Sequence, residues 1–255
     1  MNSSQPNPAV SAFDFLLGLR ESLWRSLQGN SPDGTGRFLN YCGMNFMNSR
    51  AQLFQELMVL YFLKEKRAGY FVEFGATNGV TLSNTFVLEK FFQWTGLLAE
   101  PAKGWHAALQ ANRTAAIDTR CVWAQTGQQL EFRETEIGEL STLVDLVDKD
   151  FNREGRVKGT NYPVETVSLN DLLKAHNAPK EIDYMSIDTE GSELAILQAF
   201  DFSGYDIKIM TVEHNGVEPN RQQIGELLAA KGFVRVFDFL SKFDDWYVQR
   251  SIAGL

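Results

Sequence analysis

Ionisable side chains lie at the ends of several apolar runs of this chain. They are Glu73, Glu100, Asp188, Glu213 and His214. A carboxylate can bind hydroxyls, ammonium groups or divalent cations, and a histidine can accept a proton near neutral pH. In open α/β folds, ligands bind at the edge of the sheet where the carboxyl ends of parallel strands meet. If the apolar runs are such strands, these side chains form one ligand site.

The turn after Glu73 distinguishes between classes of cofactor. A dinucleotide-binding turn needs glycines at relative positions one, three and six, but with Gly75 as the first, Thr77 and Val80 occupy the other two. The chain instead has an acid two residues before Gly75 and a further glycine at Gly79. A carboxylate there would repel a pyrophosphate and attract an ammonium group. S-adenosylmethionine (SAM) carries ribose, adenine and an α-ammonium but no phosphate, so we expect SAM as the cofactor.

A second acid agrees with this cofactor. Glu100 follows Gly79 by about 20 residues, the distance at which an acid that ends the second strand meets ribose hydroxyls. Two hydroxyl donors would satisfy a carboxylate that is otherwise costly to remove from water. The alternative is a solvated acid in front of Pro101.

These side chains need a fold that brings strand ends together, and the chain predicts one. The predicted strands span residues 70–76, 96–100, 119–124, 182–188 and 207–213. The predicted helices span residues 52–66, 81–92, 103–112, 192–200 and 221–231. Alternating strands and helices predict an α/β fold with a parallel sheet and helices on both faces.

Two parts of the chain depart from this alternation. Residues 137–163 form a long polar insertion, and the runs 129–134 and 163–167 beside it predict extra strands. Near the C-terminus, residues 233–239 and 246–252 form two strand-like runs joined by a short segment. We expect them to form an antiparallel hairpin at one edge of the sheet.

The composition excludes several function classes. A formal net charge of −8 over 255 residues argues against a nucleic-acid-binding surface. The two cysteines, Cys42 and Cys121, form no C-x-x-C pair, so we expect neither a disulfide scaffold nor a zinc ribbon. No apolar run reaches the length of roughly 20 residues that a membrane helix needs, and the N-terminus lacks a signal-peptide pattern. We therefore expect a cytoplasmic protein without an integral membrane segment.

Several segments resemble the FkbM-type family of SAM-dependent methyltransferases. They are Gly-Tyr-Phe-Val-Glu-Phe-Gly-Ala (69–76), Leu-Ser-Asn-Thr (82–85), Trp-Thr-Gly-Leu-Leu-Ala-Glu-Pro (94–101), Ser-Thr-Leu (141–143) and Asp-Thr-Glu-Gly-Ser-Glu (188–193). The resemblance implies a Rossmann-like class I methyltransferase fold, with a seven-stranded, mostly parallel sheet and one antiparallel strand. It also implies methyl transfer from SAM to a hydroxyl, often on a sugar or a polyketide. The acceptor would then be a small molecule or a glycan.

The resemblance also assigns residues to the cofactor. Residues expected at the methionine part of SAM are Glu73, Phe74, Gly75, Ala76, Thr77 and Gly79. Those expected at the ribose and adenine are Glu100, Pro101, Cys121 and Trp123. Asp188, at a strand end, is also expected to bind the cofactor. Ser83, Asn84 and Thr85 are expected on the first helix, where they donate to the cofactor carboxylate or serve the structure.

A hydroxyl is a poor nucleophile near neutral pH, so methyl transfer to it needs a base or a metal ion. His214 is the one histidine at a predicted strand end, and its ordinary pKa of about 6.5 suits a base. Asp188 or Glu213 would assist it. The alternative is a histidine whose hydrogen bonds only serve the rim of the sheet.

Three acids within six residues, Asp188, Glu190 and Glu193, need some of their charge neutralised. In one reading Asp188 faces the reacting methyl group and Glu193 pairs with an arginine or lysine. In the other, Asp188, Glu213 and His214 bind Mg²⁺ or Ca²⁺, which prefer oxygen ligands.

The N-terminal part and the insertion complete the prediction. Apolar residues at helical spacing between residues 13 and 27 predict an amphipathic helix, so residues 1–48 form a helical extension and loop before a methyltransferase domain at 49–255. The insertion is expected to be a lid or acceptor loop in which Arg153 and Arg156 recognise the acceptor, or else a solvated loop. A non-catalytic nucleotide- or glycan-binding module on this fold is the alternative function. The oligomeric state stays open, a homodimer included.

Overall fold

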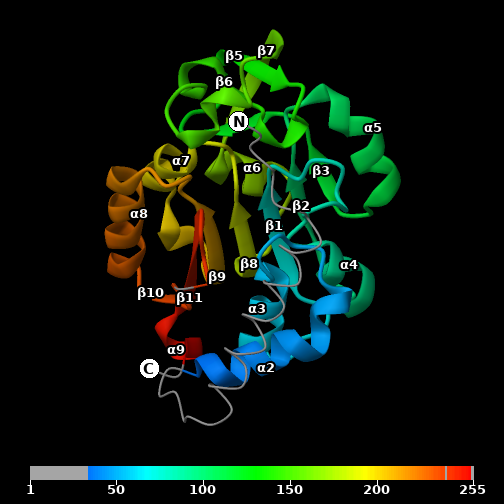
Figure 1. Ribbon diagram of the computed structural model, residues 1–255, viewed down its shortest axis with the longest axis vertical. Helices are drawn as coiled ribbons and strands as arrows, with labels where there is room; N and C mark the ends of the chain where they lie inside the picture. Colours follow the sequence, from blue (N-terminus) through cyan, green and yellow to red (C-terminus); the bar gives the residue numbers. More distant parts are fainter. Residues whose placement is uncertain (1–33, 239, 254–255) are drawn as a thin grey trace, which may run out of the picture. The chain divides into compact units, whose positions relative to one another are not determined.

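The computed structural model describes residues 34–238 and 240–253 of the chain (Figure 1). The chain divides into two compact units, residues 1–48 and 49–255. In the first unit the structure describes helix α2 (Thr35–Asn45) and the 3-10 turn η1 (Phe46–Asn48). The amphipathic helix predicted between residues 13 and 27 lies outside the described residues.

A seven-stranded sheet forms the centre of the second unit, with strand order β10-β11-β9-β8-β1-β2-β3. Its strands are β1 (Tyr70–Phe74), β2 (Thr95–Ala99), β3 (Ala116–Asp118), β8 (Glu181–Ile187), β9 (Asp206–Glu213), β10 (Phe233–Val236) and β11 (Asp244–Gln249). Only β11 runs antiparallel to its neighbours, β9 and β10. The predicted mostly parallel sheet with one antiparallel strand is therefore confirmed. Strand β1 lies between β2 and β8, which makes its carboxyl end the switch point where ligands bind.

Helices cover both faces of this sheet. Val72, Met185 and Met210 are neighbours on one face, because the parallel register aligns them, and they pack against the helices that follow β7, β8 and β9. Those helices are α6 (Leu169–Ala175), α7 (Glu193–Ala199) and α8 (Glu218–Ala230). Three further helices of this unit are α3 (Gln55–Phe62), α4 (Phe86–Phe92) and α5 (Lys103–Asn112). Figure 1 shows α7 and α8 on one side of the strands and α4 and α5 on the other.

A second, four-stranded sheet lies at the carboxyl edge of the first, at the top of Figure 1. Its strands are β4 (Cys121–Trp123), β5 (Gln129–Thr135), β6 (Thr142–Leu143) and β7 (Gly159–Ser168). Short 3-10 turns fill the insertion, namely η2 (Gly138–Leu140), η3 (Val144–Leu146) and η4 (Phe151–Glu154); η5 (Phe202–Gly204) and helix α9 (Arg250–Ala253) lie elsewhere. The two extra strands predicted beside the insertion correspond to β5 and β7.

The prediction of one strand over residues 119–124 was wrong. The third strand of the main sheet is β3, and it ends at Asp118, whose carboxylate accepts the backbone N–H of Arg120 at 2.9 Å. This side-chain turn separates β3 from β4, which pairs with β7 in the second sheet instead. The consequence for the site is that Cys121 belongs to the layer above the sheet.

Two smaller findings complete the fold. The hairpin predicted at the C-terminus is formed by β10 and β11, and both lie at the edge of the main sheet. Across the described residues, no helix combines the length and the apolar character needed to span a bilayer.

Candidate functional site

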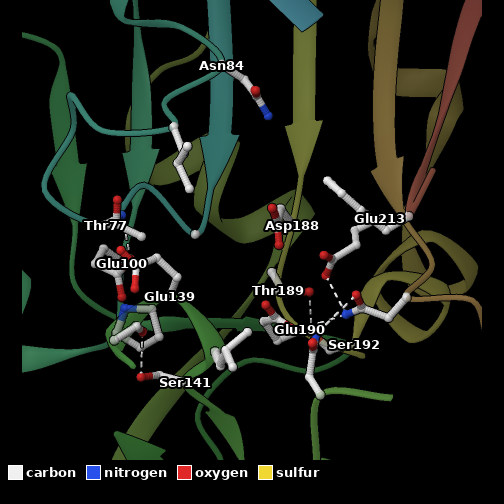
Figure 2. Close-up of a pocket in the computed structure, with 18 of the residues that line it drawn as sticks. Thr77, Asn84, Glu100, Glu139, Ser141, Asp188, Thr189, Glu190, Ser192 and Glu213 are labelled. Carbon is white, nitrogen blue, oxygen red and sulfur yellow. Dashed lines mark hydrogen bonds between the residues drawn. The ribbon is translucent and has the colours of Figure 1, made fainter. Parts of the chain in front are cut away.

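A cavity of about 280 Å³ lies at the carboxyl edge of the main sheet (Figure 2). The ends of β1, β2, β8 and β9 contribute Gly75, Glu100, Asp188 and Glu213 to its wall. The second sheet and the insertion contribute the opposite wall. The strand-end residues that the sequence grouped therefore do meet at one cavity, with the exception of Glu73 and His214.

Glu73 lies behind the wall and organises the loop after the glycine turn. Its carboxylate accepts the backbone N–H of Asn84 at 2.7 Å and the hydroxyls of Ser83 and Thr85. Arg113 lies 3.6 Å from the same carboxylate, and both side chains are buried. Because these groups surround Glu73, its carboxylate faces the protein and leaves the cavity wall to Ser83 and Asn84.

This loop also explains why a predicted helix starts late. The sequence predicted a helix over residues 81–92, but α4 begins at Phe86. Residues Thr81 to Thr85 bend instead around the Glu73 carboxylate, and Leu82 takes a left-handed backbone with φ of 58°. Ser83, Asn84 and Thr85 therefore lie in the loop before the helix. Ser83 and Asn84 line the cavity, whereas the hydroxyl of Thr85 donates a hydrogen bond to Glu73.

The two glycines of the turn serve different contacts. Gly75 has φ of +72°, and a Cβ there would lie 2.1 Å from the backbone oxygen of Asp188. Gly75 thus lets the end of β1 touch the end of β8. Gly79 has φ of +77°, and its Cβ would meet the side chains of Leu109 and Arg113 at 2.6–2.7 Å. Gly79 is therefore a packing glycine beneath the turn. Phe74 and Ala76 are also buried behind the wall.

We expect Gly75→Ala to lower the free energy of unfolding by about 3 kcal/mol, measured by urea denaturation. The left-handed backbone costs a side chain about 1 kcal/mol, and the collision with the Asp188 carbonyl adds roughly 2 kcal/mol. Gly127→Ala is the matched control, because Gly127 has φ of +82° but no atom within 4 Å of the added Cβ. It should lose only about 1 kcal/mol. Equal losses in both variants would show that close approach at Gly75 is unimportant.

Glu100 lies at the opposite end of the cavity from the acidic cluster described below. One carboxylate oxygen accepts the backbone N–H of Thr77 and the other that of Ala102, each at 2.8 Å. Thr77, Glu100 and the adjacent Pro101 all line the cavity. Burial raises the pKa of Glu100 to about 7, although the two backbone donors oppose the shift. Each oxygen still has a free lone pair that can accept a hydroxyl.

An apolar surface lies next to Glu100. Cys121, Val122, Phe132, Leu140 and Leu143 line this part of the cavity. Burial raises the pKa of Cys121 to about 12, so its thiol is neutral and acts as an apolar contact. A planar ring fits such a surface. Trp123, the other residue expected there, is half-buried among the apolar residues of the second sheet and does not line the cavity.

Three carboxyl groups form an acidic cluster at the far end of the cavity. Oxygens of Asp188, Glu190 and Glu213 all lie within 4.8 Å of one another. Asn215 donates from its side-chain amide to Glu190 at 2.9 Å and to Glu213 at 2.8 Å. Arg156 donates to the same oxygen of Glu190 at 2.5 Å. The cluster is thus held in place from two sides.

Burial and mutual repulsion change the proton affinity of this acidic cluster. Burial and the charge of Glu190 raise the pKa of Asp188 well above its ordinary value. Burial and the charge of Asp188 do the same to the pKa of Glu213. Burial raises the pKa of Glu190 to about 7, and Arg156 opposes this shift. Like charges so close together in a buried site favour the retention of at least one proton.

The structure separates His214 from this acidic cluster. Its Nδ1 accepts the backbone N–H of Gly216 at 3.1 Å, and its Nε2 lies 3.9 Å from Asp245 of β11. The side chain is buried and does not line the cavity. Burial lowers the pKa of His214. The neighbouring Asn215, with φ of 47°, lines the cavity where the histidine was expected.

Arg156 is a structural residue of the insertion. Its buried guanidinium binds Asp150 at 2.9 Å and Glu190 at 2.5 Å, and it also donates to the backbone oxygens of Leu140 and Val147. The predicted role of Arg156 in recognising an acceptor is therefore wrong, because all of its donors face the protein. Thr142 adds a second tie from the insertion, since its hydroxyl donates to the backbone oxygen of Glu190 at 2.8 Å.

Glu193 departs from the sequence-based expectation as well. Its carboxylate accepts the backbone N–H groups of Thr189 and Gly191 at 2.8–3.1 Å, instead of pairing with an arginine or lysine. It fixes the turn that follows β8. Wall residues that the sequence did not assign to the site include Gln52, Gln55, Glu139, Phe151, Thr189, Ser192 and Phe243. Phe151 belongs to the insertion, and Gln55 is the first residue of α3.

Comparison with known proteins agrees with the resemblance. The methyltransferase FkbM domain matches residues 73–247, which is more than half of the chain. No curated protein sequence matches the chain. Among solved structures, precorrin-6y C5,15-methyltransferase from Geobacter metallireducens matches 76% of this chain and 85% of its own, with 12% identity and a TM-score of 0.38. On the family match, the chain belongs to the FkbM methyltransferase family.

Proposed function

We propose that this methyltransferase uses SAM to methylate a hydroxyl on a sugar, a glycan or a small hydroxylated metabolite. The observation that carries the proposal is the arrangement of one cavity between two kinds of acid. Glu100, held by backbone donors, lies at one end, and the Asp188–Glu213 pair lies at the other. Glu100 is suited to bind the ribose hydroxyls, and the Asp188–Glu213 pair is suited to accept a proton.

The residues present fit SAM. Glu100 has free lone pairs for two ribose hydroxyls, which would stabilise its ionised form against the cost of burial. The apolar surface that includes Val122 and Phe132 suits adenine. Thr77, Ser83 and Asn84 line the wall near the glycine turn, where the methionine part would lie. The cofactor would therefore extend from Glu100 toward the acidic cluster.

The Asp188–Glu213 pair is the proposed base. Burial and mutual repulsion raise the pKa of both carboxyl groups, which makes the pair a stronger acceptor for the proton of the acceptor hydroxyl. When bound, SAM supplies a methyl group on a positively charged sulfur: the O–CH₃ bond forms as the S–CH₃ bond breaks, leaving a methyl ether and S-adenosylhomocysteine. Asn215 keeps Glu213 in position for this transfer by donating to it at 2.8 Å.

A divalent cation is the second way to lower the pKa of the acceptor hydroxyl. Asp188, Glu190 and Glu213 offer oxygen ligands of the kind that Mg²⁺ and Ca²⁺ prefer. Glu190 replaces His214 in this set. Loss of methyl transfer in EDTA, with recovery in Mg²⁺, would assign the ion a role; unchanged activity in EDTA would leave the carboxyl pair as the base.

The test of the function is a transfer assay with radiolabelled SAM and a panel of hydroxylated sugars, glycans and metabolites. Mass spectrometry then locates the added methyl group. A methyl ether on an acceptor hydroxyl is the expected product. Transfer to nitrogen or carbon alone would refute O-methylation, and binding of S-adenosylhomocysteine without any transfer would favour a binding module.

We expect the affinity for S-adenosylhomocysteine to fall about tenfold between pH 8 and pH 6 in calorimetry. The pKa of Glu100 in the free protein is about 7, so the carboxylate predominates above pH 7 and its neutral form below. The neutral form is the weaker acceptor for ribose hydroxyls. Glu100→Gln should bind weakly and show no such pH dependence. An equal pH dependence in both proteins would place the titrating group elsewhere.

A further inference from the structure

The cavity wall is acidic and carries no basic side chain. Its acids are Glu100, Glu139, Asp188, Glu190 and Glu213. None of the wall residues within the described ranges is a lysine, arginine or histidine. An acceptor with a phosphate or carboxylate would therefore meet like charge without a partner.

Two arginines that contact wall residues are already paired with acids of the protein. Arg156 is fully buried, and its guanidinium pairs with Asp150 and Glu190. Arg113 is fully buried behind the glycine turn, where it binds Glu89 at 2.8 Å. The Arg156 guanidinium thus neutralises part of the charge of the acidic cluster, and the side of the cluster that faces the cavity keeps a surplus of negative charge.

The side-chain oxygen of Asn84, at the cavity, accepts no hydrogen bond. Asn84 is 8% exposed, lines the cavity, and donates from its amide to Ser186 at 2.9 Å. Its Oδ1 is buried and has no partner. Figure 2 shows the Asn84 side chain reaching from its loop toward the part of the cavity that contains Asp188. A buried acceptor without a donor favours a ligand that brings a hydrogen-bond donor, and an ammonium group supplies several N–H donors.

We propose that the acceptor is a hydroxylated amine, such as an amino sugar or amino alcohol, whose ammonium group binds at the acidic cluster. This inference rests on the proposed O-methylation and narrows its substrate class. The ammonium group is the anchor, and a hydroxyl of the same molecule receives the methyl group. The ammonium donates to carboxylates that otherwise repel one another.

The experiment compares matched compounds that differ in charge. Calorimetry on the S-adenosylhomocysteine complex is run with D-glucosamine, D-glucose and D-glucuronate, and with 2-amino-1,3-propanediol, glycerol and glycerate. In at least one set we expect the amine to bind at least tenfold more tightly than the neutral compound, and the anion not to bind. The inference is overturned if neither amine binds more tightly than its neutral counterpart, or if an anion binds best.

Variants and Mg²⁺ separate this inference from its alternatives. Glu190→Gln should reduce the preference for the amine at least fivefold, whereas Glu165→Gln, an exposed acid outside the cavity wall, should leave it unchanged. If Mg²⁺ abolishes amine binding and supports methylation of neutral acceptors, the acidic cluster is a metal site and the inference fails. Methylation of hydroxyls without amine preference would refute only this inference, whereas N-methylation would refute the proposed function.

Discussion

Glu100→Ala is expected to weaken the binding of S-adenosylhomocysteine by about 100-fold, as measured by calorimetry at pH 8. The variant removes a charged acceptor of two ribose hydroxyls, and hydrogen bonds to a charged group contribute about 1.5–3 kcal/mol each. A loss of about 3 kcal/mol corresponds to roughly 100-fold in affinity. The same change leaves the backbone N–H groups of Thr77 and Ala102 without their acceptor. Both effects act on the cofactor end of the cavity.

Glu165→Ala is the control, because this acid is exposed on β7 and lies outside the cavity wall. It should bind S-adenosylhomocysteine as the unmodified protein does. The melting temperature of both variants separates loss of binding from loss of folding. Affinity within threefold of the unmodified protein in a folded Glu100→Ala variant would refute the ribose assignment.

Asp188→Asn is expected to lower the rate of methyl transfer about 1000-fold, while affinity for S-adenosylhomocysteine changes less than threefold. General-base catalysis contributes about 10²–10⁴-fold, and an amide cannot accept the hydroxyl proton. Removing one of two repelling acids also removes a charge that raises the pKa of Glu213. Single-turnover assays with saturating SAM and an acceptor from the screen measure the rate.

His214→Gln distinguishes the two assignments of the base. Because its imidazole lies next to Asp245 and away from the cavity, we expect this variant to keep at least a third of the activity. A loss of 1000-fold in a folded His214→Gln variant, together with an active Asp188→Asn variant, would restore the histidine as the base. Glu213→Gln should resemble Asp188→Asn, since the carboxyl pair acts as a unit.

The sheet was predictable because most of its parallel strands are apolar runs with polar residues at their ends. Strands β1, β2, β8 and β9 begin and end within two residues of the predicted bounds, and their polar ends meet as parallel strands require. Strand β3 was misplaced because it has only three residues and stops at a side-chain turn of Asp118. A strand of three residues is too short to show the alternation of apolar and polar residues by which strands are predicted.

The facing of individual side chains was less predictable. Glu73 was expected at the ligand, but three groups from residues 83–85 enclose its carboxylate. The sequence could not show this, because a loop and a helix look alike over so few residues. His214 and Asn215 are adjacent, and the backbone turn after β9 decides which of them faces the cavity.

The burial of Arg156 was also not predictable from the sequence. A basic residue in a polar insertion is usually solvated, yet this one is fully buried, because Asp150 of the same insertion and Glu190 of the turn after β8 both bind it. Such a pairing depends on the closure of the insertion against the turn after β8. No local pattern predicts it.

The enclosed carboxylate of Glu73 affects both the association rate of a cofactor and the entropy lost when it binds. Glu73 is bonded to residues 83–85, and Arg113 joins that loop to the end of α5. The half of the cavity that we propose for the cofactor is therefore pre-organised in the free protein. Binding there should need little ordering of the backbone, so its association rate should approach the limit set by diffusion and electrostatic attraction.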